Sequence, residues 1–171
     1  LFKRFNRSIS KTSPGVASQN RPSIIFRLAD FYLIYAEVAN EVNPSDSRVL
    51  TYLNLVRERA GLPKVEILNP GIVGNKELQR AAIQRERQIE LATEGQRYFD
   101  VRRWMIADKD GEGRQNGYAH GMNVRGTIND TEEFNRVVET EKIVFNRKMY
   151  LQPIPDHEMR KTQNLVQNPG W

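Results

Sequence analysis

The chain has 171 residues, of which 39% are hydrophobic and 27% are charged, and its formal net charge is +5. This length suffices for one hydrophobic core and is short for two, so we expect a single domain over residues 1–171. Basic residues are interspersed with acidic ones, so the net charge does not predict a nucleic-acid-binding patch. The sequence contains no cysteine, which excludes disulfides, thiolate metal sites and cysteine nucleophiles.

The start of the sequence carries no targeting signal. It begins at Leu1 and has neither a signal peptide nor a lipid-acceptor cysteine. Its apolar runs are shorter than the roughly 18 residues that a membrane-spanning helix needs. We therefore expect a processed product or a fragment, whose only contact with a membrane would be through a lipid anchor absent from this chain.

Residues 1–23 predict an irregular lead-in, because Pro14, Gly15 and Pro22 interrupt a polar stretch with scattered aromatic residues. The basic residues in this stretch fit either a solvated loop or a nucleic-acid contact. The solvated loop is favoured, because no predicted helix or aromatic platform adjoins it.

Residues 27–42 predict an amphipathic helix. Its apolar stripe, at spacings of three and four, consists of Leu28, Phe31, Tyr32, Tyr35, Ala36, Ala39 and Val42. Asn43 and Pro44 end the helical pattern.

A second helix is predicted after Ser45 and Asp46, either of which can cap it, and runs to Ala60 before Gly61. The predicted buried face of this helix consists of Leu50, Leu53, Val56 and Ala60. Because the connection is short, we expect the two helices to pack as an antiparallel hairpin, like one unit of a helical-repeat scaffold.

Three tyrosines on these helices, Tyr32, Tyr35 and Tyr52, have two interpretations. Their flat rings suit stacking against a sugar, but core packing is favoured. Residues 69–74 contain Asn, Pro and two Gly and predict a loop before the next helix.

Residues 77–104 are the densest in charge and aromatic side chains. They predict a long helix that ends near Thr93, with an apolar stripe of Leu78, Ala82, Ile89 and Ala92. Beside this stripe lies a row of acids at spacing four, namely Glu86, Glu90 and Glu94. Gly95 interrupts the pattern and predicts a second helix that carries Tyr98, Phe99, Val101 and Trp104.

The last third of the sequence predicts little regular structure. Glycines punctuate residues 107–130 and predict an excursion of loops. A short helix is expected from Asp130 through Val138, and one or two extended segments within 143–151. The final residues predict a surface tail held by apolar side chains, namely Leu151, Ile154, Leu165, Val166 and Trp171.

Loops can vary their binding contacts while a packed scaffold cannot, so the loops from Ala107 to Thr127 are where we expect any ligand contact. Tyr118 offers stacking and His120 offers hydrogen bonding to a saccharide. The alternative is that this excursion packs on the domain or faces a partner protein.

Glu86 and Glu90 are the best candidates for a catalytic carboxylate pair, of which one would have to be protonated. The neighbouring Arg85, Arg87 and Arg97 would hold both carboxylates ionised, so a structural ion-pair network is favoured over catalysis.

Within this network, Arg87 lies three residues before Glu90 and is expected to reach it. If Gly95 breaks the helix, Arg97 and Asp100 would lie on a second helix and fasten the two together. We expect Glu90→Ala and Arg87→Ala each to lower the melting temperature, with the double variant less impaired than the sum.

Metal and cofactor chemistry has no support in the sequence. The two histidines, His120 and His157, are not at ligand spacing from the helical acids. No phosphate-binding loop or serine-nucleophile motif is present. We therefore expect no metal, no cofactor and no nucleic-acid partner.

Several blocks of the sequence form a recognisable series. They are RLADFYLIYAEVANE at 27–41, LNLVRERAGLP at 53–63, QRERQIELATEGQRYFDVRRW at 84–104, GMNV at 121–124, and YLQPIPDHEM with LVQNPGW at the end. In this order they resemble the C-terminal part of SusD/RagB-like nutrient-uptake proteins. The motifs of this family map onto Glu86, Arg87, Glu90 and Leu91, and onto Glu94, Gly95, Arg97 and Asp100, with Trp104 closing the block.

The resemblance implies a mainly α fold of tetratricopeptide-like hairpins with long loops and few short strands. It implies a surface-exposed lipoprotein of the bacterial outer membrane that binds glycans or other nutrients and is not an enzyme. The implied partner is a SusC-like TonB-dependent transporter. The alternatives are a structural helical-repeat module without a ligand of its own and a carboxylate-dependent hydrolase.

Overall fold

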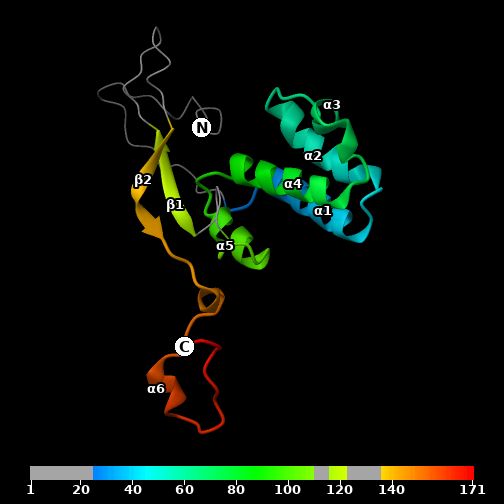
Figure 1. The fold of residues 1–171 in the computed structure, drawn as a ribbon. Coiled ribbons are helices and arrows are strands. Elements are labelled where there is room, and N and C mark those ends of the chain that lie inside the picture. Colours follow the sequence, from blue (N-terminus) through cyan, green and yellow to red (C-terminus); the bar gives the residue numbers. More distant parts are fainter. Residues whose placement is uncertain (1–24, 110–115, 123–135) are drawn as a thin grey trace, which may run out of the picture. The chain divides into compact units, whose positions relative to one another are not determined.

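The computed structural model describes residues 25–109, 116–122 and 136–171 (Figure 1). The chain forms two compact units, one within residues 1–80 and the other within residues 81–171. The boundary between them falls inside a helix, α4. That residues 1–171 act as one domain stays a prediction.

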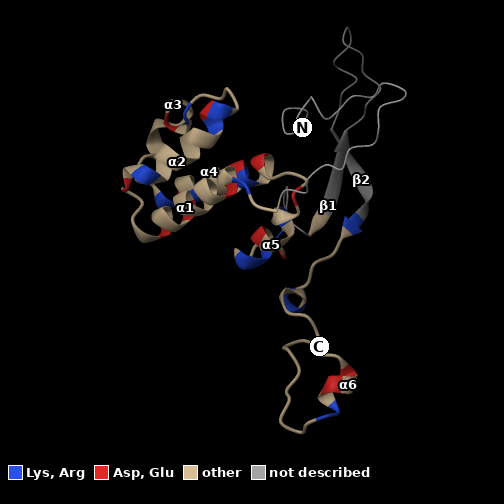
Figure 2. Cartoon of the chain, turned by 180° about the vertical axis from the view of Figure 1, so that it is seen from behind, with Lys and Arg blue, Asp and Glu red and all other residues tan. Residues whose placement is uncertain are grey.

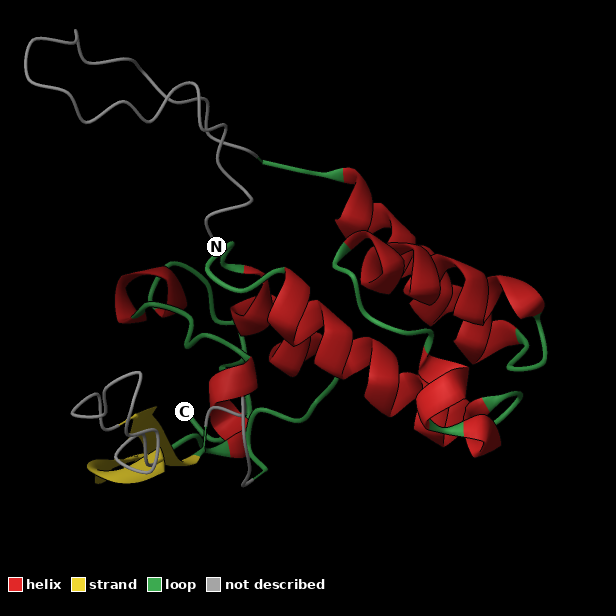
Figure 3. Ribbon diagram, turned by 90° about the horizontal axis from the view of Figure 1, so that it is seen from above, coloured by secondary structure: helices red, strands yellow, loops and turns green. Residues whose placement is uncertain are grey.

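Helices predominate in the described residues, which confirms the mainly α fold (Figure 3). The first unit contains α1 (Leu28–Val42), α2 (Ser47–Arg59), α3 (Val65–Leu68), the 3-10 helix η3 (Pro70–Ile72) and the start of α4 (Lys76–Glu90). The second unit contains the rest of α4, α5 (Gln96–Arg103), β1 (Gly117–Met122), β2 (Arg136–Ile143), the 3-10 helix η4 (Arg147–Tyr150) and α6 (Asp156–Met159).

α1 and α2 pack against each other as the predicted hairpin. The Asp46 side chain caps α2 by accepting a hydrogen bond of 2.9 Å from the Arg48 amide. At the other end Gly61 has φ of +77°, and the next amide, that of Leu62, donates back to the Arg57 carbonyl. This left-handed glycine ends α2, as the sequence predicts.

The face that α1 buries differs from the predicted stripe. Leu33 and Ala36 are fully buried, whereas Leu28, Phe31 and Val42 of the predicted stripe are exposed. The reason is that α1 carries apolar side chains around most of its circumference, so spacing alone does not select the buried side.

The three tyrosines pack between α1 and α2. The Tyr52 ring of α2 lies 5.3 Å from the Tyr32 ring and 4.6 Å from the Tyr35 ring, measured between centroids. These tilted contacts are typical of aromatic packing and support the structural interpretation of the tyrosines.

α2 buries two of its four predicted core residues, Leu53 and Val56. Ala60 is exposed, and its place in the buried face is taken by Val49 and Asn54.

Asn54 has a second function in the fold. Its amide nitrogen donates to Glu66 at 2.8 Å, and its oxygen accepts from the Val65 amide at 3.0 Å. These bonds fix the start of α3, a one-turn helix that the sequence analysis missed. The predicted loop at 69–74 likewise contains η3.

The core of the second unit consists of Val101, Ile106, Ala107 and Phe145, against which Trp104, Met149 and Tyr150 pack. β1 and β2 form an antiparallel pair whose register shifts between Tyr118 and His120. The expectation that residues 107–130 contain only loops is therefore wrong for residues 117–122. Their glycines were taken for turn signals, although a paired strand accommodates them.

The short helix expected through Val138 is wrong for the residues described, because residues 136–138 begin β2, while residues 130–135 lie outside the described part of the chain. The extended segments expected within 143–151 are present in part: Ile143 ends β2, and Asn146 and Leu151 have extended backbones. Between them residues 147–150 form η4, because the Asn146 side chain and the Met149 backbone close a helical turn.

Of the apolar side chains predicted to hold the C-terminal tail, Trp171 does so, whereas polar bonds act where Leu151, Leu165 and Val166 were expected to. Leu151, Leu165 and Val166 are exposed. Gln167 instead bonds both backbone groups of Ile154, at 2.8 Å and 2.9 Å.

The last residue closes the tail onto η4 (Figure 1). The indole nitrogen of Trp171 donates to the carbonyl oxygens of Lys148 and Leu151, each at 3.0 Å, and the Lys148 ammonium lies 4.2 Å from the ring centroid. The cation–π contact and the two hydrogen bonds make this tryptophan the closing contact of the tail.

Two leucines of α1 test which face of this helix is buried. Leu33→Ala should lower the free energy of unfolding by about 2–5 kcal/mol, because it leaves a cavity in a fully buried position. Leu28→Ala, at a side chain that is 61% exposed, should stay within about 0.5 kcal/mol of the parent. Urea titration measures both. An equal loss in the two variants would contradict the assignment of the buried face.

Candidate functional site

The junction of α4 and α5 is built around a buried ion pair. The Arg87 guanidinium donates to both carboxylate oxygens of Asp100, at 2.9 Å and 3.2 Å, and the two side chains are only 3% and 4% exposed. Arg103, one turn further along α5, donates to the same carboxylate at 2.9 Å. Bidentate geometry and burial make this pair the strongest electrostatic contact described at the junction.

The backbone between the helices makes this pairing possible. α4 ends at Glu90, three residues before the predicted end near Thr93, and Thr93 has φ of +70°. Gly95, with φ of +77°, then precedes α5 as its N-cap. Left-handed conformations at both positions turn the chain, so that Asp100 comes back onto Arg87. The predicted break at Gly95 and the second helix are confirmed.

The buried face of α4 is polar, and the predicted apolar stripe is wrong. Leu78, Ile89 and Ala92 are exposed. The buried residues of the helix are instead Gln79, Ile83, Glu86, Arg87 and Glu90. Long charged side chains bury their methylene groups while their charged ends find partners, and apolar periodicity does not detect such a face.

The remaining residues of the family motif lie at the same junction with different exposures. Glu94 and Gly95 are exposed, and Arg97 is half-buried with its guanidinium 5.7 Å from the Trp104 ring centroid. Arg103 lies 4.6 Å from the same ring. Two guanidinium groups thus contact Trp104, which itself packs on the core of the second unit.

Chemically, this junction is suited to joining helices. Glu86 and Glu90 share their buried face with Arg87, so opposite charges are buried together. Figure 2 shows Lys and Arg mixed with Asp and Glu along α4. This arrangement supports the structural interpretation of the two carboxylates over the catalytic one.

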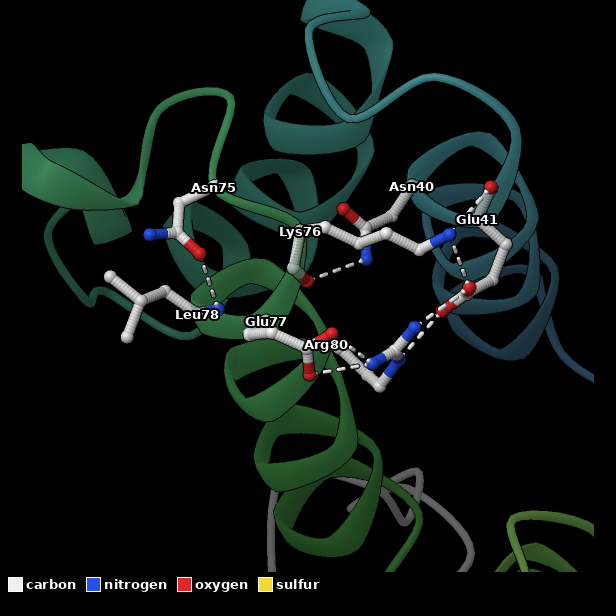
Figure 4. Close-up of polar contacts among 7 residues, drawn as sticks. All are labelled: Asn40, Glu41, Asn75, Lys76, Glu77, Leu78 and Arg80. Carbon is white, nitrogen blue, oxygen red and sulfur yellow. Dashed lines mark hydrogen bonds and ion pairs between the residues drawn. The ribbon is translucent and has the colours of Figure 1, made fainter.

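A second charged cluster joins α1 to α4 within the first unit (Figure 4). Arg80 donates to both carboxylate oxygens of Glu41, at 2.7 Å and 2.8 Å, and to Glu77 at 2.6 Å. Lys76 adds an ion pair of 2.9 Å to Glu41. The Arg80 hydrogen bonds are the main reason that the pKa of Glu41 is lowered from 4.5 to about 2.

Two neutral hydrogen bonds accompany these ion pairs, one at the start of α4 and one between α1 and α4 (Figure 4). The side chain of Asn75 accepts from the Leu78 amide at 3.2 Å and so caps the start of α4. The buried side chain of Asn40 donates to the Lys76 carbonyl at 3.0 Å. This cluster could not be predicted from the sequence, because Glu41 and Arg80 are 39 residues apart and no local pattern connects them.

The candidate ligand residues Tyr118 and His120 both lie in β1, where Tyr118 pairs with Lys142 and His120 with Val138 of β2. They belong to a paired strand and not to a loop. Their role in ligand binding stays a prediction. His157 lies in α6 and is exposed.

Within residues 25–109, 116–122 and 136–171, no group of three or more potential metal ligands gathers. None of the helices in this part of the chain is long and apolar enough to cross a membrane.

The SusD family model matches residues 1–171. The chain belongs to the SusD family. SusD-like protein P25 of Formosa agariphila is 44% identical over 62% of this chain and 19% of that protein. SusD-like protein P2 of the same organism is 31% identical over 86% of this chain and 26% of that protein.

The fold agrees with this assignment. A crystal structure of a SusD-like protein from Bacteroides fragilis NCTC 9343 matches with a TM-score of 0.68 and 31% identity, over 86% of this chain and 26% of that chain. This SusD-family chain thus spans between 19% and 26% of the length of these relatives.

The buried pair of this SusD-family chain predicts a large stability loss on truncation. Arg87→Ala and Asp100→Ala should each lower the free energy of unfolding by about 3–5 kcal/mol, because each removes one member of the buried bidentate pair and leaves the other charge buried without that pairing. The matched control is Arg103→Ala, which removes the 42% exposed partner of the same carboxylate and should cost about 0–1 kcal/mol. Calorimetric melting of the three variants measures these losses of stability. If Arg103→Ala were as damaging as Arg87→Ala, the burial argument would fail.

The cluster at Glu41 predicts a dependence of stability on pH. Because the folded-state pKa of Glu41 is lowered, its stabilisation is present above about 4.5 and is lost as the pH falls towards 2. Glu41 is well exposed, so solvent screening limits the effect to less than about 1 kcal/mol. The melting temperature of Glu41→Gln should therefore be slightly below that of the parent at pH 7 and equal to it near pH 2. The control is Glu58→Gln, which removes a looser ion pair of 3.6 Å to Lys64. If the difference in melting temperature between Glu41→Gln and the parent were the same at pH 2 as at pH 7, the ionised Glu41 carboxylate would not be its cause.

Proposed function

We propose that this chain is part of a cell-surface nutrient-binding protein of the bacterial outer membrane. In this proposal the protein binds a glycan and delivers it to a SusC-like TonB-dependent transporter. The observation that carries the proposal is the match of the SusD family model to all 171 residues. The similarity in fold to a solved SusD-like protein supports it.

The proposed partners follow from the family. They are a TonB-dependent transporter in the membrane and an oligosaccharide or other nutrient outside it. In the proposal the protein is surface-exposed and is held at the membrane by a lipid anchor that lies outside the sequence of this chain.

The proposal includes no catalysis. The acids that come closest to a hydrolase pair, Glu86 and Glu90, are buried on the face of α4 that also carries Arg87. A glycosidase needs two carboxylates that reach the sugar from opposite sides of the scissile bond. Two acids on one buried helix face do not present this arrangement to a substrate.

For ligand contact we propose Tyr118 and His120 of β1. An aromatic ring and an imidazole two residues apart combine a flat apolar surface with a hydrogen-bonding group, which suits a pyranose ring. The helices of the scaffold use their charges to bind one another, as at Arg87 and Arg80, so they have fewer polar groups to offer a sugar.

The function is tested by deleting the gene that encodes this chain in its own organism. The deletion strain should grow normally on glucose and should lose growth on one polysaccharide among xylan, pectin, laminarin and mannan. The intact gene should restore growth, and a gene that carries Tyr118→Ala should restore it only in part. The same variant should weaken binding to that polysaccharide in affinity gel electrophoresis by roughly 5- to 100-fold, since a stacked aromatic ring contributes about 1–3 kcal/mol.

Two outcomes would contradict the proposal. Normal growth of the deletion strain on every polysaccharide would favour a structural helical-repeat module with no ligand of its own. Release of reducing sugar by the purified protein, abolished by Glu90→Gln, would favour a hydrolase.

A further inference from the structure

The open end of the β1–β2 hairpin is fastened on both strands. Asn116, immediately before β1, donates from its amide nitrogen to the Asp108 carbonyl at 3.3 Å. Its amide oxygen accepts from the Phe145 amide at 3.1 Å, two residues after β2. One side chain thus joins the segment after α5 to both sides of the hairpin base.

Asp108 is itself held by a reciprocal pair of bonds with Tyr150 of η4. The Tyr150 hydroxyl donates to the Asp108 carboxylate at 2.6 Å and accepts from the Asp108 amide at 3.1 Å. Bonds to a charged acceptor are the stronger kind, and the distance agrees. Asp108 and Tyr150 are 42 residues apart, so the pair joins distant parts of the unit.

The ring of Tyr150 adds an apolar contact to the same group. It meets the Phe145 ring edge-on at 5.0 Å between centroids, and Phe145 is a core residue of the second unit. The base of the hairpin is therefore held in two ways. Hydrogen bonds join its polar groups to Asp108, and aromatic rings pack it onto the core of the second unit.

We propose that Asp108, Asn116 and Tyr150 form a hairpin clamp that positions β1 for ligand binding. The proposal rests on the proposed function, in which Tyr118 and His120 contact an oligosaccharide. These residues lie two and four positions after Asn116 in the strand that the clamp holds. A contact residue so close to a fixed point loses little freedom when the sugar binds, so the clamp lowers the entropy cost of binding.

None of the three clamp residues needs to touch the sugar. They are positioning residues, and they act on the strand that carries the contact residues. Their effect is therefore expected on the dynamics of β1 and on affinity, with little effect on the melting of the helices.

The test uses Tyr150→Phe in the full protein, which removes the hydroxyl and both its bonds but keeps the ring on Phe145. Hydrogen exchange read by mass spectrometry should be roughly 2- to 10-fold faster in peptides that cover β1, the factor expected for loss of a hydrogen bond. Exchange in α1 should be unchanged. Affinity for fragments of xylan, pectin, laminarin or mannan, whichever the parent binds, should fall by a similar factor.

Two further variants separate the possible outcomes. Tyr98→Phe, the control, also removes one phenol hydroxyl, from an exposed ring of α5, and should leave both readouts at the parent value. Asn116→Asp keeps the acceptor for Phe145 but removes the donor to Asp108, and should reproduce Tyr150→Phe.

The failures of the clamp and of the ligand assignment are distinguishable. Unchanged exchange in β1 of Tyr150→Phe would overturn the clamp. Faster exchange with unchanged affinity, in a protein whose Tyr118→Ala variant binds weakly, would overturn the positioning role. Unchanged affinity in Tyr118→Ala would overturn the ligand assignment in β1, and the positioning role with it.

Discussion

The buried ion pair between Arg87 and Asp100 is the contact on which the second unit depends most. A charge that is removed from water and left without a partner costs several kcal/mol, so the end of α4 and α5 cannot separate without a large loss of stability. Because α5 also carries Val101 of the core, the pair positions the apolar cluster to which Ile106 and Phe145 belong. The ion pair and the apolar core of this unit thus hold the same helix, α5, in place.

Polar joints of this kind recur through the described residues. Arg80 joins α4 to α1 through Glu41, Asn54 fixes the start of α3, and Asn116 with Tyr150 fastens the β1–β2 hairpin. In each joint a side chain makes hydrogen bonds or ion pairs with polar groups of another segment. Because these bonds are directional, they orient the two segments more precisely than apolar packing alone does. A scaffold joined in this way can hold a strand or loop in place while the side chains of that segment vary.

Local signals in the sequence were sufficient to predict some of these structural features and insufficient to predict others. The hairpin of α1 and α2 and the break at Gly95 were predictable, because Asp46, Gly61 and Gly95 act on their immediate neighbours. The buried sides of α1 and α4 were not, since Leu28 and Leu33 are equally apolar and α4 buries charges instead of leucines. That Asp100 fastens the second helix to the first was also predictable once Gly95 was taken as a break. Its partner Arg87 was not, because that bond depends on the turn at Thr93 and Gly95. The bond between Asp108 and Tyr150 was not predictable either, because the two residues are 42 positions apart.

The central claim is that the charges of the α4–α5 junction are architectural. It is tested most directly by the double replacement Arg87→Met with Asp100→Leu, in which apolar side chains of similar size take the place of the ion pair. Buried pairs replaced in this way commonly leave stability unchanged or raise it. The account predicts a folded protein whose free energy of unfolding is no more than about 1 kcal/mol below that of the parent, and whose affinity for the polysaccharide of the proposed function equals that of the parent. A double variant that folds and melts like the parent but no longer binds or turns over a polysaccharide would contradict it.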